Sequence, residues 1–173
     1  RRVDRRVATL GLGFDQCNIF LSRMDAPKFA DANAAIKWLD GKTVALTKLD
    51  KHTWRAAPVS GSLTLQYEVY AWDLSVRAAH LDQTHGFFNG TSVFLRVVGQ
   101  EDLAHEVDIR RPLDPAAETW RVATAMAELG AKRYGFGTYA AANYDELIDH
   151  PVEMGDFALG TFKAHGGGRK AVA

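Results

Sequence analysis

The segment SLTLQYEVYAW, residues 62–72, carries the clearest secondary-structure signal in the chain, because apolar and polar side chains alternate along it. The positions that would share one face are Leu63, Leu65, Tyr67, Val69 and Ala71. Alternation with a period of two over about ten residues is typical of a β-strand that buries one face. The segment therefore predicts a strand within a sheet.

Further short segments on both sides of residues 62–72 also have strand character. They are rich in β-branched and aromatic residues, and turn residues separate them; Asn89-Gly90 is typical of a two-residue hairpin turn. The segments comprise residues 43–47, 52–56, 92–98, 104–110, 120–126 and 157–162. Residues 120–126 are also compatible with a helix, because they are rich in alanine.

Helices are expected at only two places. Over residues 28–39, apolar residues recur every three or four positions between Pro27 and Gly41, which favours a short helix over a partly irregular lead-in. One helical turn is expected over residues 145–148, with Asn143 as its N-cap and Pro151 beyond its end. Together these patterns predict a mainly β protein, an antiparallel β-sandwich with one or two short helices.

The chain divides into three parts on this basis. Residues 1–40 are expected to form a divergent N-terminal segment that is partly helical. Residues 41–162 form the predicted β-sandwich domain. Residues 163–173, which include the run of glycines at 166–168, are expected to form a flexible tail at a truncated domain junction.

The composition is that of an ordinary globular protein, with 173 residues of which 47% are apolar and 24% charged. Basic and acidic residues each number 21, so no net positive field favours nucleic acid as a partner. No apolar run approaches the roughly 18–20 residues of a membrane span, and no membrane partner is expected. The single cysteine, Cys17, excludes an internal disulfide framework. Residues 1–6 do not begin a signal peptide, so a cytoplasmic location is expected.

The histidines are the first candidates for metal chemistry. His105-Glu106 begins like the helical zinc motif H-E-x-x-H, but position 109 is Ile and the segment alternates like a strand. His80, Asp82 and His85 could form a weak metal site, although surface histidines in a hairpin loop are the favoured interpretation. No nucleophile stands in a catalytic context. We therefore predict no catalytic residue, no metal ligand and no cofactor on this chain.

The most unusual segment is YDELIDHPVEMG, residues 144–155, which is dense in ionisable side chains. One interpretation is structural: the charged residues face water, while Leu147, Ile148 and Val152 anchor the segment on the sandwich. The other is functional: a carboxylate such as Asp149 or Glu153 projects into a neighbouring cleft and holds a cationic group of a ligand. The residues alone favour the structural interpretation.

Three segments, taken in order, resemble the glycyl-aminopeptidase family of zinc metallopeptidases. They are YEVYAWDLSVR at 67–77, HGFFNGTS at 85–92 and NYDELIDHPVEMG at 143–155. The resemblance covers about residues 41–162 and matches the N-terminal domain, which in that family is a β-sandwich ahead of the catalytic domain. The zinc, its H-E-x-x-H helix and a PDZ domain lie further along in that family.

The resemblance implies a non-catalytic N-terminal domain, with zinc expected only in the catalytic domain, which would be its partner. The implied role is to pack on that domain and help to wall the peptide-substrate cleft. Because residues 144–155 precede the domain junction in the family, the candidate contacts with the substrate or the catalytic domain are Tyr144, Asp145, Asp149 and Glu153.

Residues 1–40 depart from the family, because they lack its Pro-x-Trp-x-Pro-Gly-Ser-Tyr-type segment. We therefore expect a fragment, a truncated gene product, or a member with replaced first strands. An unpaired sheet edge would then allow self-association. The alternative function is a stand-alone β-sandwich module that binds a protein or carbohydrate, which exposed Trp54, Tyr70 and Trp72 along one strand face would favour.

Overall fold

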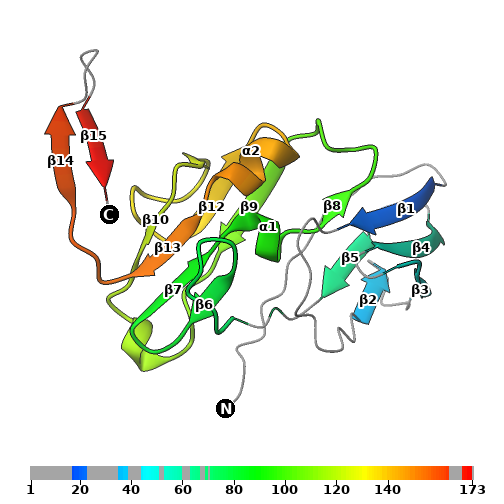
Figure 1. Ribbon diagram of the computed structural model, residues 1–173, viewed down its shortest axis with the longest axis horizontal. Coiled ribbons are helices and arrows are strands. Elements are labelled where there is room, and N and C mark those ends of the chain that lie inside the picture. The colour runs from blue at the N-terminus through cyan, green and yellow to red at the C-terminus, as the bar shows by residue number, and fades with distance from the viewer. Residues whose placement is uncertain are drawn as a thin grey trace.

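Short antiparallel strands dominate the structure, a computed structural model that describes residues 17–22, 35–38, 44–50, 53–59, 63–66, 69, 71–163 and 169–172. For residues 17–22, 35–38, 59, 64–66, 161–163 and 169–172, only the backbone is described. Figure 1 shows three groups of strands: one built largely from the N-terminal half, a central group with both helices, and a C-terminal hairpin.

The first group contains two sheets. The larger has the order β3-β4-β1-β8, and β2 pairs with β5 in the smaller. The strands are β1 (Cys17–Ser22), β2 (Ala35–Trp38), β3 (Leu46–Lys48), β4 (Thr53–Val59), β5 (Leu63–Gln66) and β8 (Arg96–Val97). Val44, Ala56, Leu63 and Val97 are the buried apolar residues described in this part.

The central group is sandwich-like. One sheet has the order β10-β13-β7-β6 and the other β11-β12-β9, and all of their pairs are antiparallel. The strands are β6 (Ala79–Leu81), β7 (His85–Phe88), β9 (His105–Ile109), β10 (Arg121–Ala123), β11 (Ala127–Glu128), β12 (Gly137–Ala141) and β13 (Val152–Gly155).

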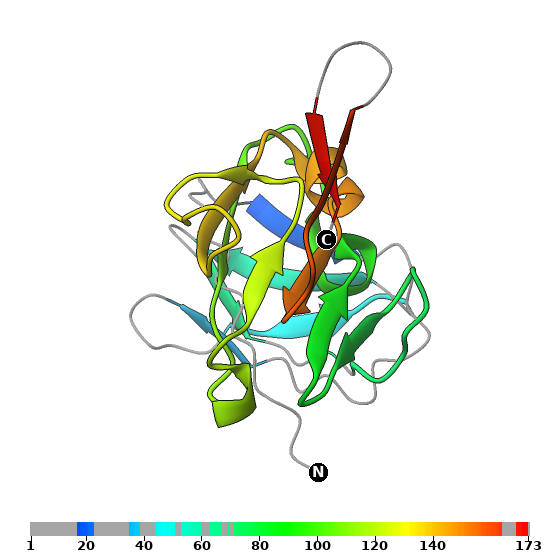
Figure 2. The same cartoon turned by 90° about the vertical axis from the view of Figure 1, so that its left-hand side faces the viewer.

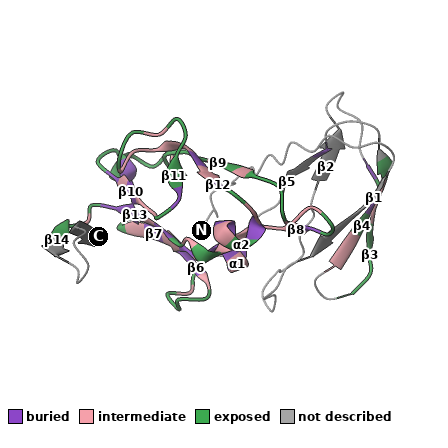
Figure 3. Ribbon diagram, turned by 90° about the horizontal axis from the view of Figure 1, so that it is seen from above, coloured by how far each residue is buried: buried purple, intermediate pink, exposed green. Residues whose placement is uncertain are grey.

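A single apolar core joins these two sheets, because side chains from the inner faces of both belong to one buried cluster. Its strand members include Phe88, Val122, Val152 and Met154 from the first sheet, and Ile109, Tyr139 and Ala141 from the second. Figure 3 shows that the buried residues gather in this part of the molecule. The predicted mainly β, sandwich-like fold with short helices is confirmed.

Two short helices and one 3-10 turn, η1 (Pro115–Ala117), complete the central group. In α2 (Tyr144–Asp149), the N-cap Asn143 accepts a hydrogen bond through Oδ1 from the Glu146 amide at 2.8 Å, which confirms the predicted cap. None of the described helices is long and apolar enough to cross a membrane.

The prediction of a hairpin turn at Asn89-Gly90 is wrong. Asn89 is instead the N-cap of α1 (Gly90–Val93), and its Oδ1 accepts a hydrogen bond from the Thr91 amide at 3.0 Å. A Cβ at Gly90 would lie 2.7 Å from Ile148 Cα, so the glycine allows α1 to approach the backbone of α2. Asn89 therefore caps α1, and Gly90 allows its close packing against α2. Of the strand predicted over residues 92–98, only β8 at residues 96–97 is present.

Other predictions are wrong in their extent. Within the helix predicted over 28–39, residues 35–38 form strand β2, because pairing with β5 overrides the local helical pattern. The remainder of that helix lies outside the described residues. In the predicted tail, residues 169–172 form β15 (Arg169–Val172), which pairs with β14 (Gly160–Lys163). This hairpin projects away from the central sheets (Figures 1 and 2).

The long strand predicted over 62–72 is also shorter than its alternation suggests. β5 ends at Gln66, Val69 and Ala71 belong to no strand, and Trp72 forms only an isolated bridge with His80. The strands predicted over 104–110 and 120–126 are confirmed as β9 and β10.

Candidate functional site

The four candidate contact residues of the charged segment do not form one site. Tyr144, the first of them, lies in the core with 1% of its surface exposed. Its hydroxyl donates to the Phe94 carbonyl at 3.1 Å, and its amide donates to the Glu101 carbonyl at 2.8 Å. Tyr144 therefore fixes the start of α2, and its side chain is covered in this chain.

Asp145 and Asp149 lie on the exposed side of α2. They line an open depression of about 700 Å³ together with Arg77, Asn89, Thr91, Asn143, Glu146 and Ile148. The Glu146 carboxylate is engaged, because it accepts a hydrogen bond from the Ala142 amide at 2.7 Å. Neither the Asp145 carboxylate nor the Asp149 carboxylate forms a hydrogen bond or ion pair with another described residue. Their carboxylates remain available to a cationic group from outside the chain.

Glu153 lies elsewhere, on the outer face of the β10-β13-β7-β6 sheet. Its neighbours on β13, Val152 and Met154, point into the core and are 0% and 1% exposed. Because alternate residues of a strand face opposite sides, Glu153 faces outward. The register places it opposite Phe87, which lies opposite His80 on the next strand.

This outer face carries one row of side chains that runs across the sheet, because residues directly opposite each other share a face. We call the row Trp72, His80, Phe87 and Glu153 the outer row. Glu153 is half-buried and has no hydrogen-bond or ion-pair partner among the residues that the structure describes. Burial raises the pKa of its carboxyl above the usual value, and the nearby His85 and His80 partly offset that increase.

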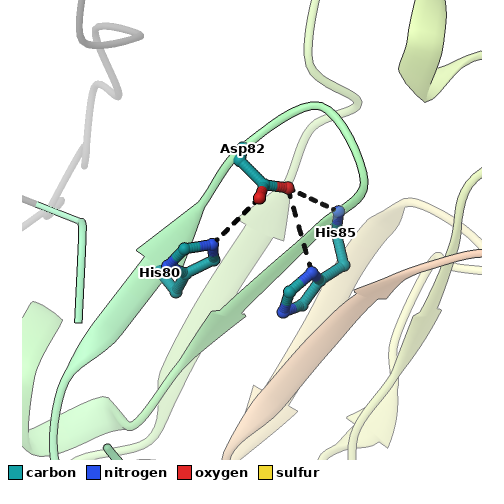
Figure 4. Close-up of side chains that lie close together, drawn as sticks. All are labelled: His80, Asp82 and His85. Atoms are coloured by element: carbon teal, nitrogen blue, oxygen red, sulfur yellow. Dashed lines mark hydrogen bonds and ion pairs between the residues drawn. The ribbon is translucent and has the colours of Figure 1, made fainter. Parts of the chain in front are cut away.

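The hairpin of β6 and β7 brings His80, Asp82 and His85 together beside the outer row (Figure 4). His80 Nε2 lies 3.2 Å from Asp82 Oδ2, and His85 Nδ1 lies 3.9 Å from Asp82 Oδ1. The two imidazole rings stack with centroids 5.0 Å apart and an interplanar angle of 25°. Two imidazoles and a carboxylate can hold a divalent cation.

Local hydrogen bonds explain why Asp82 takes this position. Its Oδ1 accepts from the Thr84 amide and hydroxyl, both at 2.7 Å, and from the His85 amide at 3.1 Å. This is an Asx turn, which aspartate favours at the tip of a hairpin. The Thr84 hydroxyl and amide hold the pKa of the Asp82 carboxyl well below its usual range, so the group is ionised at neutral pH.

The preferred interpretation of these histidines as surface residues of a hairpin loop is wrong for His80, which lies on β6 and is only 7% exposed. The Trp72 ring packs at 5.1 Å from its ring and covers it. The sequence did contain a usable signal. Asp82-Gln83-Thr84 is typical of an Asx turn, which predicts that His80 and His85 lie on adjacent strands.

His105 belongs to a different environment, on the inner face of β9. Burial lowers the pKa of its imidazole, and its nearest described aromatic neighbour is Tyr144, with ring centroids 6.0 Å apart. Within the described part of the chain, His105 belongs to no group of three potential metal ligands. Position 109, where the zinc motif would have its second histidine, is Ile109, which is buried in the core.

Comparisons with known proteins assign the chain to a protein family. The model of the peptidase M61 N-terminal domain matches residues 28–156. The chain is also similar to the crystal structure of an aminopeptidase N family protein from Idiomarina loihiensis, with 34% identity and a TM-score of 0.78. That match covers 94% of this chain but only 28% of the other. No curated protein matches the chain.

The resemblance inferred from residues 67–77, 85–92 and 143–155 is thus confirmed, and two of those segments supply the cap of α1 and the whole of α2. The matched region also includes β2, which lies within the segment expected to diverge. The chain belongs to the family of peptidase M61 N-terminal domains.

Proposed function

We propose that this chain is a non-catalytic domain that packs on the catalytic domain of a zinc aminopeptidase and forms one wall of its peptide-binding cleft. The observation that carries the proposal is the half-buried Glu153 carboxylate, which has no partner among the described residues. Family membership supports the role, since the similar structure is much longer than this chain.

A carboxylate in this state costs stability, because burial penalises its charge and the nearby His85 and His80 offset only part of that penalty. Such groups are characteristic of sites where a ligand supplies the missing charge. The amino-terminal ammonium of a peptide is a cation of suitable size, and an aminopeptidase must recognise it. We therefore assign Glu153 to the substrate ammonium, and Asp145 and Asp149 to contacts with the catalytic domain.

Exposed apolar side chains in the loop that begins at Trp72, a member of the outer row, support the proposal that another domain covers this face. Trp72, Leu74 and Val76 follow one another in a loop and are 53%, 65% and 75% exposed. Apolar side chains gathered in this way mark interaction surfaces on many proteins. A catalytic domain that packs on this loop would bring its cleft to the outer row.

The alternative, a free-standing binding module, depends on aromatic residues aligned on one strand face. Trp54 lies on β4, whereas Trp72 lies beyond β5 and bridges to β6. These two rings therefore do not form such a row, and Tyr70 lies outside the described residues. The domain function remains the better supported of the two.

The test uses the complete polypeptide that contains this domain and measures hydrolysis of glycyl peptides. Glu153→Gln is expected to raise KM by at least about tenfold with little change in kcat, because a charge-assisted contact contributes about 1.5–3 kcal/mol. Glu118→Gln, at an exposed carboxylate that follows η1, is the matched control and should change neither constant.

Two results would overturn the proposal. Equal kinetic constants for Glu153→Gln and the control would remove Glu153 from substrate binding. Hydrolysis of peptides by the 173-residue chain alone would contradict a non-catalytic role.

A further inference from the structure

We propose that His80, Asp82 and His85 form a binding site for a divalent transition-metal ion, and that zinc is the ion it takes. The site lies at the tip of the β6–β7 hairpin (Figure 4). It does not depend on the proposed function, since binding is measured without peptide or catalytic domain.

The distances suit a metal site that closes slightly around its ion. One potential ligand atom from each residue lies within 4.8 Å of the other two. Two atoms bound to one tetrahedral zinc at about 2.0–2.1 Å lie about 3.4 Å apart. Rotations of the three side chains can cover this difference of up to about 1.4 Å without a movement of the strands.

The state of His80 is the independent observation that points to a ligand. The side chain is 7% exposed, yet neither ring nitrogen forms a hydrogen bond with a described residue. Nε2 lies 3.2 Å from Asp82 Oδ2, an ion-pair contact whose geometry falls short of a hydrogen bond, and Nδ1 has no hydrogen-bond partner among the described residues. Buried imidazole nitrogens are nearly always paired, because an unpaired polar group costs about 1–3 kcal/mol. A metal ion between Nε2 and Oδ2 would satisfy both atoms.

The surroundings hold the ligands in place before an ion arrives. The three donors to Asp82 Oδ1 fix the carboxylate and leave Oδ2 pointing toward His80. The Trp72 ring packs against the His80 ring at 5.1 Å and limits its rotation. Outer contacts of this kind orient metal ligands and strengthen binding.

The ligand set selects the class of ion. Magnesium and calcium require mainly oxygen ligands, whereas two imidazoles with one carboxylate suit zinc and its neighbours in the transition series. Three protein ligands leave a fourth position for water or an incoming group. Glu153 lies on the same sheet face, opposite Phe87, which is itself opposite His80.

The test uses the 173-residue chain without an affinity tag, freed of metal by a chelator. Zn²⁺ is titrated by calorimetry, and Co²⁺ is titrated by its visible absorption. We expect one ion per chain and a tetrahedral Co²⁺ spectrum. His85→Gln and Asp82→Asn should each weaken binding by at least about tenfold. His150→Gln, which removes an imidazole near Glu146 instead, is the matched control and should leave binding unchanged.

Imidazole nitrogen NMR keeps the proposal testable if a variant fails to fold, which circular dichroism would reveal. Zn²⁺ should shift the ring resonances of His80 and His85 in the unaltered chain. The proposal is wrong if Zn²⁺ uptake is not stoichiometric, if His85→Gln binds as tightly as the original chain, or if only other histidines shift.

Discussion

Replacing Gly90 with alanine tests whether the close approach of the two helices fixes the central part of the fold. The added Cβ would lie 2.7 Å from Ile148 Cα and 3.0 Å from the Leu147 carbonyl oxygen. Both are backbone atoms of α2, so no side chain can swing away to make room. The helix cannot shift freely either, because Leu147 and Tyr144 are buried at 3% and 1% exposure.

The expected cost follows from two opposing effects. Overpacking of a filled site costs about 1–3 kcal/mol, whereas alanine gains up to about 1 kcal/mol over glycine in a helix. The gain is smaller at Gly90, the first residue of a one-turn helix. We expect a net loss of about 1–2 kcal/mol, or about 2–8 °C in Tm for a chain of this size.

Urea unfolding of the 173-residue chain, followed by tryptophan fluorescence, measures the loss. Gly160→Ala is the matched control, because a Cβ there meets no described atom within 4 Å, and its stability should change little. If Gly90→Ala is as stable as the control, the helices do not approach as described, and the explanation of Asn89-Gly90 given above fails.

Three further substitutions test other features by thermal and urea unfolding. Glu153→Gln should raise Tm at pH 7 but not at pH 4. Because the pKa of the Glu153 carboxyl is raised in the folded state, the free energy of unfolding of the original chain falls as pH rises above about 4.5. Glutamine carries no charge, so the variant does not lose this stability. An equal effect at both pH values would show that burial of charge is not the cause. Tyr144→Phe removes the hydroxyl that donates to Phe94 and should cost about 1 kcal/mol, so an unchanged midpoint would count against that bond. Arg111→Ala removes the hydrogen bonds to three backbone carbonyls around η1 and should lower the free energy of unfolding by about 1–2 kcal/mol. Arg111→Lys should recover only part of this loss. Full recovery would show that a positive charge alone is sufficient.

The sequence predicted the fold class and the elements whose signals are local. Asn143 caps α2 because its side chain reaches an amide only three residues away, and the alternation around Val107 places β9 correctly. Where the outcome depended on distant partners, prediction failed. Residues 35–38 have a helical pattern but pair with β5, and Gly90 serves a helix that lies more than fifty residues further along.

The candidate site was predictable only in part, for the same reason. Residues 144–153 stand out by charge density, but the first of them lie in helix α2 and the last in strand β13. Tyr144 therefore faces the core, whereas Glu153 faces outward from the sheet. The burial of His80 depends on Trp72, which reaches it through an isolated bridge that no local pattern reveals.

The outer face of the β10-β13-β7-β6 sheet therefore carries two polar groups whose pairing with described residues is incomplete. His80 is buried without hydrogen bonds to described residues, and Glu153 holds a half-buried charge without a described partner. Apolar side chains at both positions would be more favourable if stability alone were required, because the described neighbours compensate only in part for the lost hydration of each polar group. The inner face of the same sheet is apolar at Val122, Val152 and Met154, so the composition of the outer face is not a general property of these strands. The two proposals account for these groups together, because a metal ion at His80 and a cationic group at Glu153 would supply the missing partners on one face.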